Sequence, residues 1–305
     1  MTELLQALIS GLAVGGAYAL VALGFNITFT TTKTLNFSHG DFVSAGAFAG
    51  LSVLLILLGK PINASLSGEI LHGWQQGLAV LVVIGVVGLL GALIYAVAVR
   101  PFAGKVGMSW VMSTIGFGII LRSLGLAIWG PGTMTVPPPL GDSVIRFFGA
   151  GIRPQELLVL VVALLVMIIF DMVMRKTMIG KAMRAVAHNK QVASLMGINV
   201  TAVMVGAFFV SSALAGLSGI LLAPITSVSI FMGLMIGLKG FSGAIIGGLS
   251  SPRGCVFGGF LLGVLESLVN LWQAQWREIV VFLLVILVLA IRPNGLLGAK
   301  FVEKV

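Results

Sequence analysis

Few side chains in this sequence are of the types that do chemistry, and their spacing fits no catalytic motif. The three histidines, His39, His72 and His188, lie far apart, and no His/Glu pair has the spacing of a metal site. No G-x-S-x-G stands at a strand-to-helix turn, and no G-x-x-x-x-G-K-[ST] could cradle a nucleotide phosphate. The single cysteine, Cys255, allows no disulfide framework and no thiolate metal site. We therefore expect no catalytic residue, no metal site and no cofactor bound by this chain.

Four ionisable side chains fall inside or near the ends of apolar stretches, where a charge facing lipid is costly. We expect Lys239 and Glu266 to pair, to line a water-filled path, or to pack against a sister subunit. Asp171 precedes Arg175 by four residues, which predicts a local ion pair near the membrane surface. Arg122 lies toward one end of its stretch, and we expect its long side chain to reach the surface from there.

Two polar, glycine-containing stretches are typical of the broken helices that build transporter binding sites. Residues 34–41 read TLNFSHGD, and a side chain there could cap a helix start and leave amides free for a carboxylate, although a plain capped turn fits as well. Residues 237–243 read GLKGFSG, and we expect these glycines to break a helix. The capping candidates are Asn36, Ser38 and Asp41. We place the substrate path near Asn36, Ser38, His39, Gly40, Ser113, Thr114, Gly116, Lys239, Ser242, Gly243 and Glu266.

The composition is that of an integral membrane protein. Of 305 residues, 58% are hydrophobic and only 9% are charged, against about 25% charged in soluble domains. The 41 glycines favour close helix packing within a membrane. The basic residues behind the net charge of +9 are scattered between apolar spans, so this charge does not indicate nucleic-acid binding. We predict a single domain, residues 1–305, with an all-α polytopic fold of about 8–10 transmembrane or re-entrant helices.

Nine apolar stretches approach the roughly 20 residues that a span requires. They are residues 4–25, 42–58, 78–99, 110–129, 157–174, 201–223, 228–249, 256–272 and 279–291. If the amino terminus is outside and the nine stretches cross the membrane in turn, the following basic residues fall on the inside: Lys33, Arg100, Lys105, Arg175, Lys176, Lys181, Arg184, Lys190, Arg253, Arg292, Lys300 and Lys304. The outside receives only Lys60, Arg146, Arg153 and Arg277. This asymmetry follows the positive-inside rule and sets the predicted orientation, with residues 130–156 as an outer connecting loop.

A basic segment, residues 175–199, separates the fifth and sixth stretches. It reads RKTMIGKAMRAVAHNKQVASLMGIN and contains no acidic residue. Residues 181–196 hold no Gly or Pro, and their apolar stripe predicts one amphipathic helix between Gly180 and a left-handed Gly197. On the cytoplasmic side, such a helix could contact lipid headgroups or a soluble protein docked under the membrane.

Several motifs follow one another in an order that is typical of a known family. They are residues 18–24, 35–41, 100–101, 113–116, 180–187, 193–199, 243–248 and 292–298. In these segments the chain resembles, nearly end to end, the inner-membrane permease subunits of branched-chain amino acid ABC importers, the LivH type.

The resemblance implies a division of labour. A pair of permease subunits forms the path, two cytoplasmic ABC ATPases bind ATP and Mg²⁺, and an external binding protein delivers the substrate. It also implies a bacterial or archaeal cytoplasmic (inner) membrane, and a chain that is not itself an enzyme. The family's cytoplasmic loop relaxes the Glu-Ala-Ala-x-x-x-Gly loop of ABC importers, and here Gln191, Val192 and Ala193 stand in its first three places. The implied ATPase contacts are Lys181, Arg184, Ala185, His188, Gln191, Ala193, Ser194 and Gly197.

Other functions remain open at this point. The family includes permeases that look like urea or short-amide carriers, and no motif separates these substrates. An ion-coupled secondary transporter would have to use Glu266, Lys239 and His39, and a channel would need a filter motif that the sequence does not show. Neighbouring reading frames for ATPases and a secreted binding protein would separate an ABC importer from these alternatives.

Overall fold

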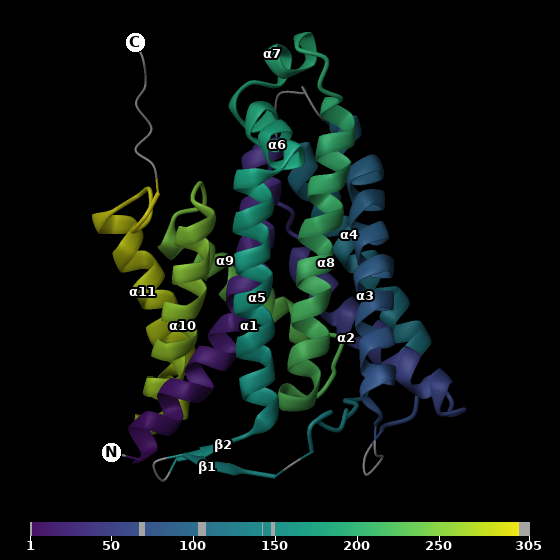
Figure 1. Ribbon diagram of the computed structural model, residues 1–305, viewed down its shortest axis with the longest axis vertical. Helices are drawn as coiled ribbons and strands as arrows, with labels where there is room; N and C mark the ends of the chain where they lie inside the picture. Colours follow the sequence, from purple (N-terminus) through teal and green to yellow (C-terminus); the bar gives the residue numbers. More distant parts are fainter. Residues whose placement is uncertain (1, 67–70, 103–107, 142, 148–149, 299–305) are drawn as a thin grey trace.

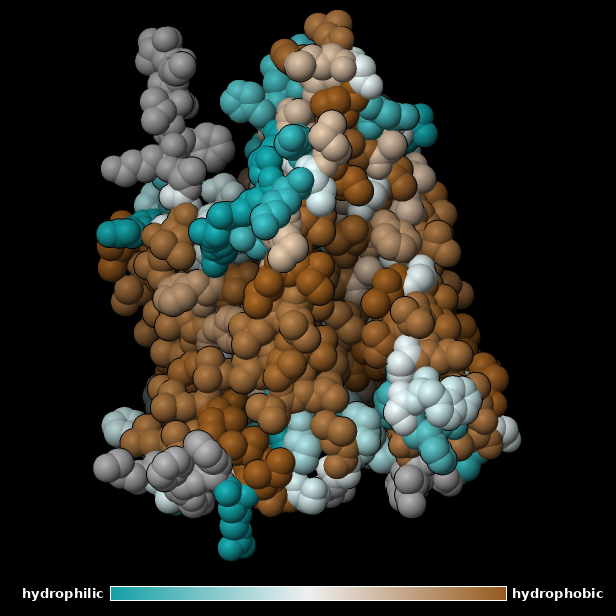
Figure 2. Space-filling model, in the orientation of Figure 1, coloured by the Kyte–Doolittle hydropathy of each residue, from teal (hydrophilic) through white to brown (hydrophobic). Residues whose placement is uncertain are grey.

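The computed structural model describes residues 2–66, 71–102, 108–141, 143–147 and 150–298, and it forms a helix bundle (Figure 1). Within these ranges, eight helices are long and apolar enough to cross a membrane. Brown, hydrophobic side chains form a broad belt around the bundle, with polar groups gathered at its two ends (Figure 2). The chain is therefore a multi-pass, all-α membrane protein. Lys105, Lys300 and Lys304, which the sequence assigns to the inside, lie outside the described residues.

The long helices are α1 (Thr2–Thr32), α2 (His39–Leu57), α3 (Gly73–Ile94), α4 (Ser109–Trp129), α5 (Pro154–Lys176), α8 (Val200–Thr226), α10 (Pro252–Trp272) and α11 (Arg277–Ile291). A π-helical turn (Tyr95–Val99) and a 3₁₀ turn (Arg100–Phe102) extend α3, and a 3₁₀ turn (Ala274–Trp276) precedes α11. Three further helices are not among the eight candidate spans: α6 (Met178–His188), α7 (Lys190–Leu195) and α9 (Met232–Gly247). In the loop after α4, β1 (Ile145–Phe147) and β2 (Ala150–Ile152) form an antiparallel hairpin with Ile145 opposite Ile152.

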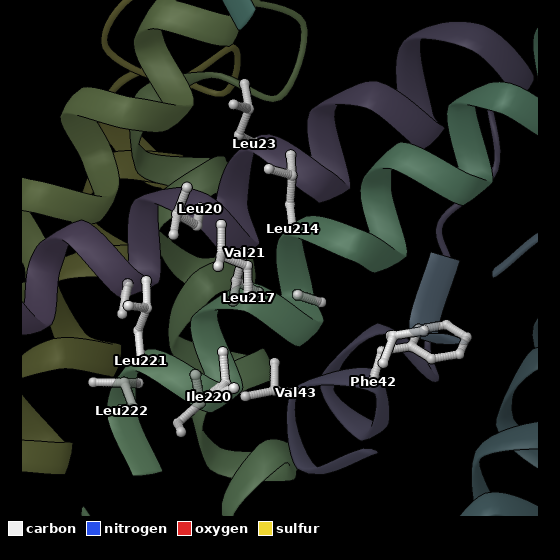
Figure 3. Packing of buried hydrophobic residues seen from close by; sticks show 14 of the residues in the cluster. Leu20, Val21, Leu23, Phe42, Val43, Leu214, Leu217, Ile220, Leu221 and Leu222 are labelled. Carbon is white, nitrogen blue, oxygen red and sulfur yellow. The ribbon is translucent and has the colours of Figure 1, made fainter. Parts of the chain in front are cut away.

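Helix α1 is the centre of the bundle, and α5, α8, α9 and α10 all pack on it (Figure 1). Residues 15–28 are buried around the whole circumference of the helix, as expected of a helix that is apolar on all sides. Small residues bring α10 close, because Gly259 packs on the backbone of Ala19 and Gly263 packs on Gly15. On the other side, Leu20 and Val21 face Leu217 of α8 (Figure 3).

Helix α2 begins within the bundle and not at its surface. Its first residue, His39, contacts Val21 and Gly24 of α1, whereas α1 continues to Thr32. At 1.5 Å per residue, the eight residues from Gly24 to Thr32 span about 12 Å, so α2 starts about that far from the end of α1 along the helix axis. The non-helical segment 33–38 covers this distance, so the predicted helix discontinuity before Gly40 is confirmed.

Helix α9 is the second discontinuous crossing. Residues 227–231 return from the end of α8 into the bundle, where Ile230 accepts a hydrogen bond from Ser44 of α2 at 2.9 Å. This return pairs Val228 with Met134 of the outer loop, so the predicted span 228–249 contains only a 16-residue helix. The expectation that residues 237–243 break the helix is wrong. The break lies before Met232, and the glycines serve packing.

The basic segment folds into two helices, which corrects the prediction of one helix over residues 181–196. Helix α6 ends at His188, and Asn189 caps α7 by accepting from the amides of Gln191 and Val192. Thr177 caps α6 in the same way, so Gly180 lies inside that helix and does not bracket it. The left-handed Gly197 is confirmed, with φ +81°.

The charged groups agree with the predicted orientation. Lys33, Arg175, Arg184, His188 and Arg253, all assigned to the inside, line one cavity at the α6 end of the bundle. The hairpin β1–β2 lies at the opposite end, next to the start of α1 (Figure 1).

Two matched cysteine substitutions test this sidedness in a Cys255→Ser background. Ser194, on α7, and Ser143, before β1, are both exposed. An impermeant maleimide added to intact cells should label Ser143→Cys and should label Ser194→Cys only after the cells are opened, because the reagent cannot cross the membrane. Labelling of position 194 in intact cells would contradict the orientation.

Candidate functional site

A buried charge cluster joins α1, α9, α10 and α11. Lys239 Nζ lies 2.8 Å from Glu266 Oε1 and 2.8 Å from Glu278 Oε1, and Arg277 Nε lies 3.2 Å from Glu266 Oε1. The Tyr18 hydroxyl donates to Glu266 Oε2 at 2.9 Å. Two cations and two carboxylates make the cluster neutral, so neither buried charge is left without a counter-ion.

This cluster confirms one of the three arrangements expected for Lys239 and Glu266, namely that they pair. The sequence alone did not indicate Tyr18, Arg277 or Glu278 as partners. Arg277 and Glu278 start α11, and their side chains reach Lys239 of α9 and Glu266 of α10. The sequence does contain one signal of these partners: Arg277 and Glu278 are an adjacent cation and anion directly before an apolar stretch.

A second polar group surrounds the start of α2. Asn36 and Ser38 are buried, and Asn36 Oδ1 accepts from both the amide and the hydroxyl of Ser38, at 3.2 and 2.8 Å. Ser38 occupies the N-cap position, but its side chain accepts no capping hydrogen bond. The first turn of α2 packs against α4, where Ser38 and Asp41 both contact Gly118.

Arg122 pairs with Asp41 in the interior, which corrects the expectation that it reaches the surface. Arg122 Nε lies 2.9 Å from Asp41 Oδ1, and only 4% of the Asp41 side chain is exposed. The pair forms because α2 begins in the interior, opposite the middle of α4. Asp41 lies 81 residues before Arg122, so no local sequence pattern indicates that the two side chains pair.

His39 is held within the helix packing. Its Nε2 lies 3.2 Å from the Val21 carbonyl oxygen, and its ring meets Phe25 edge-on at 4.5 Å. Ser211 of α8 donates to the Gly24 carbonyl at 2.8 Å and approaches His39 Nδ1 at 3.5 Å. The imidazole therefore joins α1, α2 and α8.

The residues predicted to line a path fall into two groups. Asn36 and Ser38 lie just before α2, and His39 and Gly40 start it. Ser113, Thr114 and Gly116 lie on the first half of α4, the helix that packs on the start of α2. Lys239 and Glu266 form the charge cluster, and Ser242 is buried on α9. Gly243 packs on Gly258 and Gly259 of α10. Gly40 connects the two groups, because its backbone lies against Gly233 and Gly237 of α9.

The α6–α7 segment divides its apolar side chains between two surfaces. Met183, Val186 and Ala193 are buried on the bundle, whereas Leu195 is 88% exposed and Met196 76% exposed. Figure 2 shows brown side chains at the tip over α7. Of the predicted contact residues, Ala193 is buried, Ala185 is half-buried, and Lys181, Arg184, His188, Gln191, Ser194 and Gly197 are exposed.

Two basic side chains fasten this segment to the spans. Arg184 Nη1 donates to the Met174 carbonyl of α5 at 2.7 Å, and Lys190 Nζ donates to the Thr32 carbonyl at the end of α1 at 3.1 Å. Partial burial lowers the pKa of Lys190, and the nearby Lys33 lowers it further. The predicted ion pair of Asp171 with Arg175 is confirmed at 3.1 Å, and Asp171 also holds Arg253 of α10 at 3.3 Å.

A charge-balance experiment tests the Lys239 cluster. Lys239→Met or Glu266→Gln alone leaves a net charge in the cluster and should cost about 3–5 kcal/mol. The double variant restores neutrality and should recover most of this loss. Unfolding in detergent can be followed by reaction of a thiol dye with Cys255, which is buried in the folded chain. Additive losses in the double variant would show that the two residues are not coupled.

Comparison with known proteins agrees with this architecture. Residues 7–289 match the family model described as "Branched-chain amino acid transport system / permease component". The chain is 30% identical to the high-affinity branched-chain amino acid permease protein LivH of Escherichia coli K12, over 99% of this chain and 97% of that protein. It is 31% identical to BraD of Pseudomonas aeruginosa, over 99% and 98% of the two chains. A probable LivH of Methanocaldococcus jannaschii is 27% identical, over 92% and 89%.

These matches cover nearly the whole of each chain, including both discontinuous helices and the α6–α7 segment. The protein belongs to the family of branched-chain amino acid transport system permease components.

Proposed function

We propose that the chain is the permease subunit of an ATP-driven importer for branched-chain and other hydrophobic amino acids. It would form the path with a second permease subunit, in the cytoplasmic membrane of a bacterium or archaeon. Two cytoplasmic ATPases would bind ATP and Mg²⁺, and an external binding protein would deliver the substrate. Near-full-length similarity to permeases named for branched-chain amino acid transport is the observation that carries the proposal.

The α6–α7 segment supports coupling to a partner at the inner end of the bundle. Arg184 holds the segment on α5, Lys190 holds it on α1, and both of its helices pack on α8, so movement of these spans would be passed to the segment. The outward apolar residues Val192, Leu195 and Met196 stand beside basic groups, a combination suited to a helix that inserts into a protein cleft.

Reconstitution of the complete complex tests the transport function. Proteoliposomes holding this chain, its partner permease, the ATPases and the binding protein should accumulate radiolabelled leucine only when ATP is present on the ATPase side. Accumulation of urea or a short amide, without leucine, would instead support the related carriers. Leucine uptake that requires an ion gradient and no ATP would indicate a secondary transporter.

A matched pair of substitutions tests the docking tip. Leu195→Asp removes an exposed apolar anchor and should weaken ATPase binding by about 2 kcal/mol, roughly thirtyfold in affinity. Leu140→Asp, in the outer loop, replaces an exposed leucine of the same kind and should leave ATPase binding unchanged. Co-purification of the ATPase with each variant measures the effect. Equal retention with both variants would contradict docking at α7.

A second pair tests the backbone turn that follows α7. Gly197 has φ +81° with open space around it, so a valine there is strained by its backbone alone, at about 1–2 kcal/mol. Gly197→Val should leave membrane insertion intact but reduce ATPase docking and uptake together, because it reorients α7. Gly132→Val is the control, since Gly132 has open space and no left-handed backbone. If Gly197→Val transported normally, the turn would have no part in coupling.

A further inference from the structure

A cavity of about 190 Å³ within the bundle is lined by an ion pair and an apolar wall. It lies between α2, α3 and α4, beside the start of α9. Asp41 and Arg122 line it together with Phe48 and Trp129. The cavity therefore borders both helix breaks, since Asp41 is in the first turn of α2 and Ile230 comes just before α9.

The charged groups of this cavity are close together but retain unused hydrogen-bonding capacity. Arg122 Nε and Asp41 Oδ1 are 2.9 Å apart, yet neither atom forms a directed hydrogen bond. Asp41 is 5% exposed, and the Arg122 side chain is 25% exposed. Buried polar groups are normally hydrogen-bonded, so an ion pair on a cavity wall whose facing atoms make no directed hydrogen bond points to a polar ligand.

The rest of the wall is apolar. Val87 and Leu90 of α3, Leu121 and Ile128 of α4, and Ile230 surround the space. Toward the outer end of α4, Trp129 Nε1 donates to Ser52 Oγ at 2.8 Å, and the Trp129 ring stacks on Phe48 at 4.9 Å. The cavity wall thus holds one ion pair and one aromatic pair, and the remaining aliphatic side chains could pack against a branched hydrocarbon group.

We propose that this cavity binds a free amino acid with an aliphatic side chain, with its ammonium on Asp41, its carboxylate on Arg122 and its side chain against the apolar wall. The assignment rests on the proposed function, and it names the contacts that would hold the substrate during passage. A guanidinium can bind a carboxylate through two parallel hydrogen bonds.

Charge balance favours a zwitterion over other ligands. When an amino acid separates Asp41 from Arg122, each side chain exchanges one counter-ion for another, and the interior stays neutral throughout. An anion would leave the Asp41 charge unmatched, and a cation would do the same to Arg122. Urea carries no charge and no aliphatic group, so it could use neither the ion pair nor the apolar wall.

Protection of an introduced cysteine tests the site in the complete reconstituted complex. Ala49 lines the cavity and is half-buried, whereas Ala92 is half-buried on α3 and outside the cavity lining. In a Cys255→Ser background, L-leucine should slow alkylation of Ala49→Cys by N-ethylmaleimide and should not affect Ala92→Cys. Leucinamide lacks the carboxylate and isocaproate lacks the ammonium, so neither should protect. Equal protection by all three compounds would overturn the zwitterion assignment.

Substitution of the ion pair gives the second measurement. Asp41→Asn with Arg122→Gln keeps the interior neutral. Its folding is checked by the unfolding curve of a version that retains Cys255 and has alanine at position 49, and by co-purification of the ATPase. The leucine concentration for half-protection of Ala49→Cys should rise at least about tenfold, because two charge-assisted contacts are lost. Unchanged protection in this double variant would overturn the proposal.

Leucine uptake by the unsubstituted complex is measured in parallel. Uptake without protection of Ala49→Cys would overturn the site and leave the proposed function standing. Absence of ATP-driven uptake would overturn the proposed function, and the site assignment with it.

Discussion

The structure depends on one constraint: inside a membrane, every charge and every backbone polar group must find its partner within the protein. Lys239 and Glu266 meet this requirement because they belong to a neutral cluster that also contains Arg277 and Glu278 from the start of α11. The short helix α9 meets it at both ends. The Ser44 hydroxyl accepts from the Gly233 amide, and Leu296 and Leu297 donate to the carbonyls of Ile246 and Gly247.

The same constraint explains the three glycines that meet where two helices start inside the bundle. The starts of α2 and α9 meet with Gly40 against Gly233 and Gly237, and a Cβ on any of them would collide with backbone. Close approach surrounds the exposed amides and carbonyls of a helix break with protein, which is the condition for tolerating a break at membrane depth. The two breaks can therefore border one cavity without opening the backbone to lipid.

The α6–α7 segment shows how a short amphipathic region can be rigid and still available to a partner. Asn189 divides it into two helices, so its apolar residues point in two directions. Met183, Val186 and Ala193 fix it to the spans, while Leu195 and Met196 remain exposed at the tip. A single helix with one apolar stripe could contact only one of these two surfaces.

Local patterns in the sequence determined much of this protein. Hydropathy gave an all-α membrane bundle, the distribution of Lys and Arg predicted its orientation, and Gly197 correctly indicated a left-handed turn. The spacing of Asp171 and Arg175 also predicted their ion pair, because a helix brings residues four apart onto one face.

Only the tertiary structure decided which distant groups meet. Arg122 was expected at the surface, but the interior start of α2 places Asp41 beside it. Helix α9 was expected to break at its glycines, but these pack on α1, α2 and α10, and the break lies before Met232. The physical reason is that periodicity reports which face of a helix is apolar, whereas the depth at which a helix begins depends on contacts with other helices. The partners of a buried charge depend on that depth, and no local pattern contains it.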